Sequence, residues 1–261
     1  MRIGDLSAEQ QCWFIETIVR LTYPVYCTTG VHDFDYHFIG SGFLLRWEKR
    51  VFFVITSHQV KLANGGTIFF AYQDAEKGIR VDHGKALGFE NSDLVLSELT
   101  VDETLSNLRC VELPFLKQPE SPNDLEYIVV GYQRALNTVD WENKLIQPKV
   151  GGLITNKIHI GRSTDPIELD LCTVSLSAVS NLRTFEDLTQ GLSGSPVFGF
   201  KINSVSTNEA DIDFHFMGVA AYVSETHRKL YAVRTYELIS CLNAGFKVFS
   251  EYETAHSQNE I

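Results

Sequence analysis

The segment GLSGSPVF, residues 191–198, holds a serine between two glycines directly before an apolar run. Glycines at these positions allow the backbone to form a tight turn that presents the hydroxyl of Ser193. In such a turn the N–H groups of Gly191 and Ser193 point toward one spot, where they bind a developing oxyanion. Taken alone, the segment is also typical of an ordinary turn between two strands. Its meaning therefore depends on what the rest of the chain supplies.

Two residues upstream supply the other groups that a serine nucleophile needs. His58 follows the apolar run VFFVITS, and Asp93 opens the run DLVL, so both are expected at the ends of strands. A histidine takes the proton of the serine, and a carboxylate fixes its tautomer and stabilises the imidazolium. The sequence thus predicts a catalytic triad of His58, Asp93 and Ser193, with an oxyanion hole formed by the amides of Gly191 and Ser193.

Most of the chain consists of short β-rich runs separated by Gly, Asn, Asp and Pro, which predicts an all-β fold. A hairpin is expected where residues 41–47 turn at 48–50 into residues 51–56. The proline-rich segment 114–124 is expected to connect two lobes.

Helices are expected only near the two ends of the chain. Ser7 and Gln10 form a capping-box pattern, which predicts an amphipathic helix over residues 8–22. Thr235 is expected to cap a short C-terminal helix.

The composition is that of a folded globular protein and argues against several classes of partner. Of the 261 residues, 44% are hydrophobic and 21% are charged, and the net charge is −11. This charge repels phosphate backbones, so we expect no nucleic-acid partner. No stretch approaches about 20 uninterrupted apolar residues, and the N-terminus lacks a signal-peptide pattern. We therefore expect no membrane partner and a cytoplasmic location.

The cysteines and histidines show no metal-binding or redox pattern. The five cysteines are widely spaced, without a CxxC pair, and are expected to be free thiols in a reducing compartment. His83, His159 and His215 share no ligand-like spacing with a third group. We expect no metal and no cofactor.

Taken in order, these blocks resemble the chymotrypsin-like (trypsin-like, PA clan) serine protease family, nearest the minimal bacterial HtrA-type branch without a PDZ domain. The resemblance covers roughly residues 24–243. It is carried by GSGFLL at 40–45, VITSH at 54–58, DLVL at 93–96, VVGYQ at 129–133, GLSGSPVF at 191–198 and MGVAAYV at 217–223. The order histidine, aspartate, serine is that of this family, whereas α/β-hydrolases run serine, aspartate, histidine.

The resemblance implies a chymotrypsin fold, which is all-β, with two six-stranded antiparallel β-barrels. Its implied parts are an N-terminal amphipathic helix extension (1–23), a first barrel with His58 and Asp93 (24–116), a second barrel with Ser193 and the C-terminal helix (117–250), and a polar tail (251–261).

The resemblance further implies a serine endopeptidase that hydrolyses peptide bonds of protein or peptide substrates. Its substrate pocket would be formed by Asp187, Gln190, Ala221, Tyr222 and Val223. Asp187 stands where trypsin has its pocket-floor aspartate, which favours Lys or Arg in the substrate. Val223 replaces a glycine that keeps that pocket open, which favours small side chains. The sequence leaves both preferences open.

Two departures from the family concern how the site is ordered. Leu192 stands where digestive proteases have the aspartate that pairs with a newly cut N-terminus, and Gln59 stands where they have a disulfide cysteine. We expect activity to be gated through the loop 177–190 by an activating protein partner or by oligomerisation. The alternatives are a catalytically silent interaction module and an esterase that uses the same residues.

Overall fold

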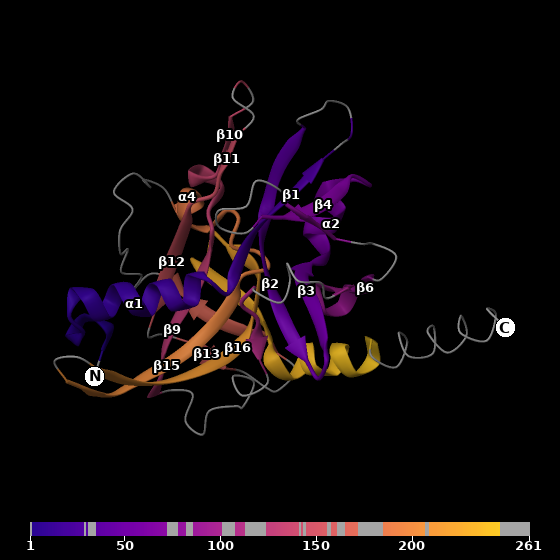
Figure 1. The fold of residues 1–261 in the computed structure, drawn as a ribbon. Helices are drawn as coiled ribbons and strands as arrows, with labels where there is room; N and C mark the ends of the chain where they lie inside the picture. Colours follow the sequence, from indigo (N-terminus) through magenta and orange to yellow (C-terminus); the bar gives the residue numbers. More distant parts are fainter. Residues whose placement is uncertain are drawn as a thin grey trace.

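The computed structural model describes residues 2–28, 30, 35–71, 78–81, 86–100, 108–112, 124–140, 142, 145–155, 158–160, 165–171, 185–206 and 209–245. The protein is mostly β, with two sheets lying side by side as two lobes and helices near both ends of the described chain (Figure 1). The predicted fold class, two antiparallel β lobes with terminal helices, is confirmed at this level.

The first lobe contains an eight-stranded sheet in the order β5-β4-β1-β2-β3-β7-β6, with β8 beside β2. Its strands are β1 (Thr22–Thr28), β2 (Tyr36–Trp47), β3 (Arg50–Thr56), β4 (Thr67–Phe70), β5 (Ile79–Arg80), β6 (Ala86–Phe89), β7 (Leu94–Leu99) and β8 (Val111–Glu112). Every pair is antiparallel except β2 and β8, which are parallel. The sheet exceeds the six predicted strands because the two-residue strands β5 and β8 add to it.

The predicted hairpin between residues 41 and 56 is present in this sheet. Trp47 pairs with Arg50, and the turn between them contains Glu48 with φ of 55°. β3 is buried along almost its whole length, since the core of the lobe covers one face and the second lobe covers the other. The strand therefore ends at Thr56 in a fixed position beside the interface between the lobes.

The second lobe contains a seven-stranded antiparallel sheet in the order β12-β9-β15-β16-β17-β14-β13. Its strands are β9 (Glu126–Tyr132), β12 (Val150–Thr155), β13 (Ile158–Ile160), β14 (Ile167–Asp170), β15 (Pro196–Val205), β16 (Ala210–Ser224) and β17 (Lys229–Arg234). A separate hairpin joins β10 (Thr138–Asp140) to β11 (Leu145–Gln147). Residues 113–123, which include most of the predicted connector, lie outside the described residues, as does the predicted tail.

The largest hydrophobic cluster lies between the two lobes. It combines side chains of β2 and β3 with side chains of β9, β15 and β16, and the rings of Phe43 and Phe216 meet across it at 5.4 Å. Burial of aromatic surface of this kind contributes strongly to docking. The lobes are therefore fixed against each other by apolar packing along the interface that carries the site described below.

Helix α1 (Ala8–Val19) packs against the second lobe. Its predicted capping box is confirmed, because the Ser7 hydroxyl accepts a hydrogen bond from the Gln10 N–H and the Gln10 side chain accepts one from Ser7. The ring of Phe14 lies 4.8 Å from that of Phe200, whereas Trp13 faces solvent with 59% of its surface exposed. The helix ends before residue 22, because β1 begins there.

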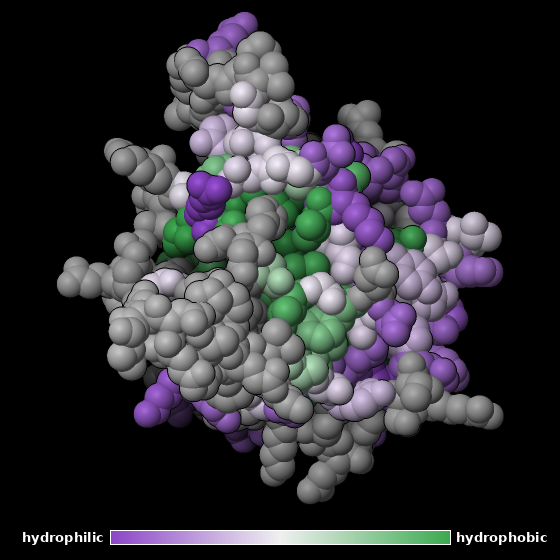
Figure 2. Space-filling view, turned by 90° about the vertical axis from the view of Figure 1, so that its right-hand side faces the viewer, coloured by the Kyte–Doolittle hydropathy of each residue, from purple (hydrophilic) through white to green (hydrophobic). Residues whose placement is uncertain are grey.

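A second helix covers residues 235–245 and lies beneath the first lobe in Figure 1. Its Glu237 accepts a hydrogen bond from the hydroxyl of Ser92, which precedes Asp93 in the chain. Seen from the right-hand side of Figure 1, hydrophobic residues gather near the middle of the face, and hydrophilic residues lie mainly toward its outer parts (Figure 2). Within the described ranges, no helix has the length and apolar character needed to cross a membrane.

Candidate active site

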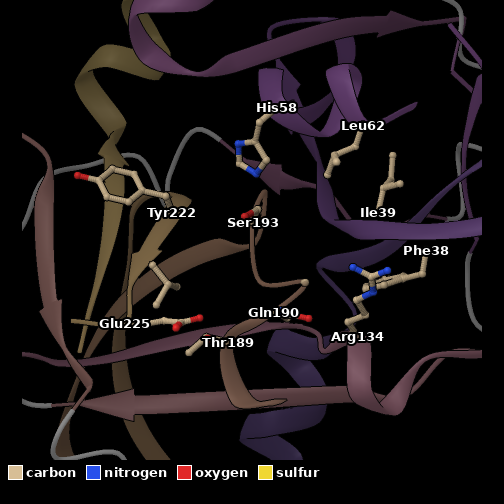
Figure 3. Close-up of a pocket in the computed structure, with 12 residues that line it drawn as sticks. Phe38, Ile39, His58, Leu62, Arg134, Thr189, Gln190, Ser193, Tyr222 and Glu225 are labelled. Atoms are coloured by element: carbon tan, nitrogen blue, oxygen red, sulfur yellow. The ribbon is translucent and has the colours of Figure 1, made fainter. Parts of the chain in front are cut away.

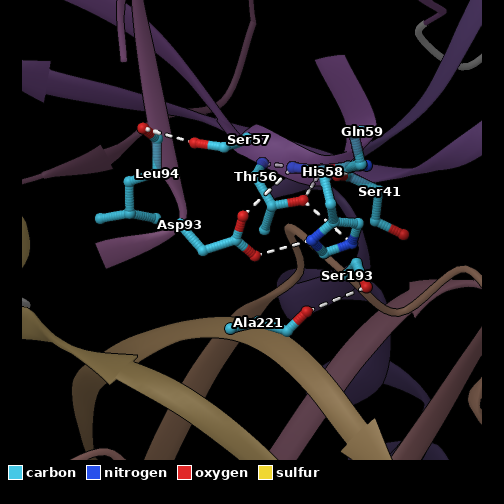
Figure 4. A network of polar contacts seen from close by, with 9 residues as sticks. All are labelled: Ser41, Thr56, Ser57, His58, Gln59, Asp93, Leu94, Ser193 and Ala221. Carbon is cyan, nitrogen blue, oxygen red and sulfur yellow. Dashed lines mark hydrogen bonds and ion pairs between the residues drawn. The ribbon is translucent and has the colours of Figure 1, made fainter. Parts of the chain in front are cut away.

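His58 and Asp93 meet at the end of β3 and the start of β7. His58 is the second residue of α2 (Ser57–Ala63), a helix that begins directly after β3, and Asp93 stands one residue before β7. The Nδ1 atom of His58 lies 2.6 Å from Oδ2 of Asp93, and the backbone N–H of His58 donates to Oδ1 at 3.1 Å (Figure 4). An ionised carboxylate only accepts, so Nδ1 carries a proton in this pair.

The backbone of Asp93 adopts the left-handed conformation, with φ of 50°. Its carbonyl oxygen accepts a hydrogen bond from the N–H of Ser57 at 3.0 Å, and the hydroxyl of Ser57 donates to the carbonyl of Leu94. The backbone of Asp93 is thus held by Ser57, and its carboxylate is held by His58. Aspartate tolerates this conformation better than most residues, because its short polar side chain bonds locally.

Ser193 lies in the turn between α4 (Phe185–Thr189) and β15. Gly191 and Gly194 have φ of 95° and 83°, and a β carbon on Gly194 would lie 2.0 Å from the carbonyl oxygen of Ser41. Both glycines are therefore required by the turn. Ser195 is completely buried, whereas Ser193 lines an open pocket.

Two amides of this turn remain available to a ligand. The N–H groups of Leu192, Gly194 and Ser195 each donate to a backbone carbonyl. The N–H groups of Gly191 and Ser193 donate to no acceptor among the described residues. Pairs of unsatisfied amides beside a nucleophile suit binding of an oxyanion.

Ser41, on β2 of the first lobe, holds the nucleophile turn by two bonds. Its N–H donates to the carbonyl of Ser193 at 3.0 Å, and its hydroxyl donates to the carbonyl of Gly191 at 2.7 Å. The same hydroxyl accepts from the N–H of Tyr132 at 2.8 Å. Leu192 contributes from the other side, because its side chain is fully buried in the core of the second lobe. The turn is therefore ordered by apolar packing and neutral hydrogen bonds.

Gln59 links helix α2 to the same strand. Its side chain is fully buried, its amide nitrogen donates to the carbonyl of Ser41 at 2.9 Å, and its amide oxygen accepts from the N–H of Thr56 at 2.8 Å. A β carbon on Gly40 would lie 2.4 Å from the Gln59 amide nitrogen. The amide of Gln59 thus fills the space beside Gly40.

His58 and Ser193 each have another hydrogen-bond partner in this structure. The hydroxyl of Ser193 donates to the carbonyl of Ala221 at 3.1 Å, and Nε2 of His58 lies 3.3 Å from the hydroxyl of Thr56 (Figure 4). That hydroxyl donates to the amide oxygen of Gln59 at 2.8 Å. Proton transfer requires the hydroxyl of Ser193 to turn from Ala221 toward His58.

A pocket of about 280 Å³ opens in front of Ser193 and His58 (Figure 3). Of the predicted pocket residues, Gln190, Tyr222 and Val223 line it, whereas Ala221 only contributes its carbonyl to Ser193. Sequence reasoning missed the other lining residues, which are Phe38, Ile39, Leu62, Arg134, Thr189 and Glu225.

Asp187 does not line this pocket. It lies on α4, two residues before Thr189, which does line it. Residues two apart on a helix do not share a face, so the helix turns Asp187 away from the side that Thr189 presents. A helix directly before the nucleophile turn was not among the predicted elements. Residues 172–184 lie outside the described residues, and they include residues 177–184 of the predicted gating loop.

The described cysteines and histidines do not form a metal cluster. Within the described residues, no three His, Cys, Asp or Glu side chains lie together in a group that could hold a metal ion. His159 lies on β13 and His215 on β16. His83 and Cys172 lie outside the described residues. Burial raises the pKa of the thiols of Cys27, Cys110 and Cys241, which keeps these thiols protonated and poorly nucleophilic.

Comparisons with known proteins give a likeness of fold only. No protein-family model matches the chain, and a search of curated proteins finds no match. Among solved structures, the apo form of the MamO protease domain from Magnetospirillum magneticum is similar over 87% of this chain and 97% of that chain. The TM-score is 0.48 and the sequence identity is 11%. The function of this site is therefore argued from its own geometry.

Proposed function

We propose that the protein is a serine endopeptidase in which Ser193 attacks the peptide carbonyl and His58 takes the serine proton. Asp93 orients His58 and stabilises the imidazolium, and the amides of Gly191 and Ser193 bind the oxyanion of the tetrahedral intermediate. His58 then donates its proton to the leaving amine, which leaves an acyl-enzyme on Ser193. Water attacks this acyl-enzyme while His58 takes a proton from the water, and His58 returns the proton to Ser193 as the acid is released.

One observation carries this proposal: a histidine held at two points by one carboxylate lines the same pocket as Ser193, whose own amide and that of Gly191 find no acceptor among the described residues. A structural histidine or an ordinary turn explains either half alone, but neither explains their meeting in one pocket. Each oxyanion donor in such a site typically contributes about 100-fold to 1000-fold in rate.

A second candidate, a catalytically silent interaction module, is favoured by the bond between Ser193 and Ala221. Before chemistry begins, the hydroxyl of Ser193 must turn from Ala221 toward His58. A substrate, an activating protein partner or oligomerisation can bring about this rotation. In an interaction module without catalytic activity, the bond between Ser193 and Ala221 would persist.

Fluorophosphonate labelling of the purified protein tests the proposal, because the probe reacts only with an activated serine. We expect wild type and Ser195→Ala to be labelled and Ser193→Ala and His58→Ala not to be labelled. Ser195→Ala is the matched control, since it removes a neighbouring buried hydroxyl. Labelling that persists in Ser193→Ala would contradict the proposed nucleophile. Absent labelling of folded wild type would favour the module.

Hydrolysis assays then separate peptidase from esterase. A peptidase cleaves quenched fluorescent peptides with a rate that falls in parallel with labelling in His58→Ala. Cleavage of activated esters alone would indicate an esterase.

A further inference from the structure

The pocket carries opposite charges on the two sides of the nucleophile. In Figure 3 Ser193 lies between the two charged residues, with Arg134 beside Phe38 on one side and Glu225 near Thr189 on the other. A ligand that crosses the pocket over Ser193 therefore meets a cation on one side of its reacting bond and an anion on the other.

Arg134 is held firmly by its backbone while its side chain stays available. It begins a 3-10 turn (Arg134–Leu136), and its N–H donates to the carbonyl of Gln190 at 2.7 Å, three residues before Ser193 in the chain. The side chain of Asn137 fixes this turn by bonding to Gln133 and Lys149. The guanidinium of Arg134 is exposed and has no ion-pair partner in the described part of the chain.

Glu225 occupies the opposite end in a comparable state. It is exposed in the turn that follows β16, where its carbonyl accepts a hydrogen bond from the N–H of Arg228. Its carboxylate, like the guanidinium of Arg134, makes no ion pair with any described residue. Neither charge is therefore needed by the fold as described.

Two large, mainly apolar side chains stand exposed at the same pocket. Leu62, on α2, has 65% of its surface exposed, and Tyr222 has 53%, and both line the pocket. Large apolar side chains at a pocket rim indicate a surface that a partner covers. A peptide chain fits this surface, because it supplies apolar and charged side chains at fixed spacing along one backbone.

We propose that the substrate is a peptide segment of mixed charge, with an acidic side chain on the Arg134 side of the cleaved bond and a basic or neutral side chain on the Glu225 side. This inference rests on the proposed function and names the substrate class of the same site. The planar guanidinium of Arg134 suits a carboxylate because it offers two parallel donors. Glu225 selects against an acidic residue on its own side by repulsion.

The test is a charge scan of one peptide that the wild-type protein cleaves. Each of three positions on either side of the cleaved bond is replaced in turn by Glu, Gln or Lys, and kcat/KM is measured. On one side we expect kcat/KM for the Glu peptide to exceed that for the Gln peptide by about fivefold, which is the effect of one exposed ion pair. On the other side we expect kcat/KM for the Lys peptide to exceed that for the Gln peptide. Both preferences weaken at high salt.

Charge-reversal variants assign each preference to its residue. Arg134→Glu should invert the ratio of Glu to Lys peptides on the first side only, and Glu225→Lys should invert it on the second side only. The Gln peptide serves as the reference within each variant. Arg20→Glu and Glu209→Lys make the same charge changes at exposed positions that do not line the pocket, and should leave both ratios as in wild type.

A binding arm separates failure of this inference from failure of the proposed function. Fluorescence anisotropy with Ser193→Ala measures affinity for labelled Glu and Lys peptides without any chemistry. Equal ratios on both sides in a protein that cleaves peptides would overturn the inference and leave the proposed function standing. If wild type is inert, the scan is made on a peptide that binds Ser193→Ala, and equal binding of its Glu and Lys versions overturns the inference.

Discussion

The side-chain amide of Gln59 donates a hydrogen bond to the carbonyl oxygen of Ser41 at 2.9 Å, and so joins the helix of His58 to the strand that holds Ser193. Both partners are completely buried. His58 and Ser193 come from different lobes, and their relative position depends on this link and on the two bonds from Ser41 to the turn that contains Ser193.

Replacing Gln59 by leucine should lower both stability and reactivity. The change leaves the Ser41 carbonyl and the Thr56 N–H buried without partners, which should reduce the free energy of unfolding by about 2–4 kcal/mol. Labelling of Ser193 should slow as well. Urea denaturation measures the first effect. Gln11→Leu, which removes a part-buried bond to the Leu6 carbonyl, should cost less than about 1 kcal/mol, and equal losses would argue against the link.

Leu192→Ala should loosen the nucleophile turn. Truncation of a buried leucine typically costs about 2–5 kcal/mol, and here the cavity would open directly beneath Ser193. Leu169→Ala removes a side chain equally buried in the same core but on β14. We expect similar losses of thermal stability, with slower labelling in the folded state only for Leu192→Ala. Unchanged labelling in Leu192→Ala would mean that the turn is ordered by hydrogen bonds alone.

Asp93→Asn should abolish most activity without disturbing the fold. Asparagine adopts the left-handed conformation readily, so the φ of 50° is preserved, but its amide no longer imposes the tautomer with Nδ1 protonated. A loss of about 10⁴-fold in kcat is expected for this change in a triad. Asp211→Asn, an exposed substitution on β16, provides the comparison. Near-normal turnover in folded Asp93→Asn would show that Asp93 is not the orienting acid.

Stability should decline in alkaline solution because of buried tyrosines. Burial raises the pKa of Tyr132 to about 12 and also raises the pKa of Tyr26 and Tyr127. In the unfolded chain these phenols lose their protons near pH 10, so above that pH the unfolded state binds fewer protons than the folded state. The stabilisation is complete below about pH 10 and is lost as the pH rises toward 12.

For Tyr132 the expected loss of free energy of unfolding is about 3 kcal/mol. Urea denaturation at a series of pH values from about 8 to 11.5 measures the decline, and Tyr132→Phe should make it shallower. A free energy of unfolding that does not change over this range would contradict the burial of the phenols.

Local patterns in the sequence predicted the elements that depend on short-range chemistry. The capping box at Ser7 and Gln10, the hairpin around Glu48 and the glycines beside Ser193 were read from a few neighbouring residues. The same reasoning overlooked α2, although Thr56 and Gln59 have the spacing of a capping box. The apolar run before Thr56 predicts a strand, and with that prediction the helix that follows was not recognised.

Long-range relationships in the site were harder to predict. Nothing near Ser41 in the sequence indicates that its hydroxyl serves a turn that comes about 150 residues later. Arg134 and Glu225 reach the pocket only because the lobes dock as they do. Asp187 was assigned to the pocket floor by alignment of one short motif, which does not reveal a helical turn.

Ser41 lies on one lobe and bonds to the turn of Ser193 in the other, so the reactivity of Ser193 should depend on how the two lobes are docked. A small rigid-body separation would break its bonds to Gly191 and Ser193 at once while each sheet keeps its own strands. Under mild denaturant or pressure, Ser193 would then lose its reactivity before either half melts. The reactivity of Ser193 would therefore depend on how the two lobes pack against each other. A molecule that tightens or separates the interface between the lobes would raise or lower that reactivity.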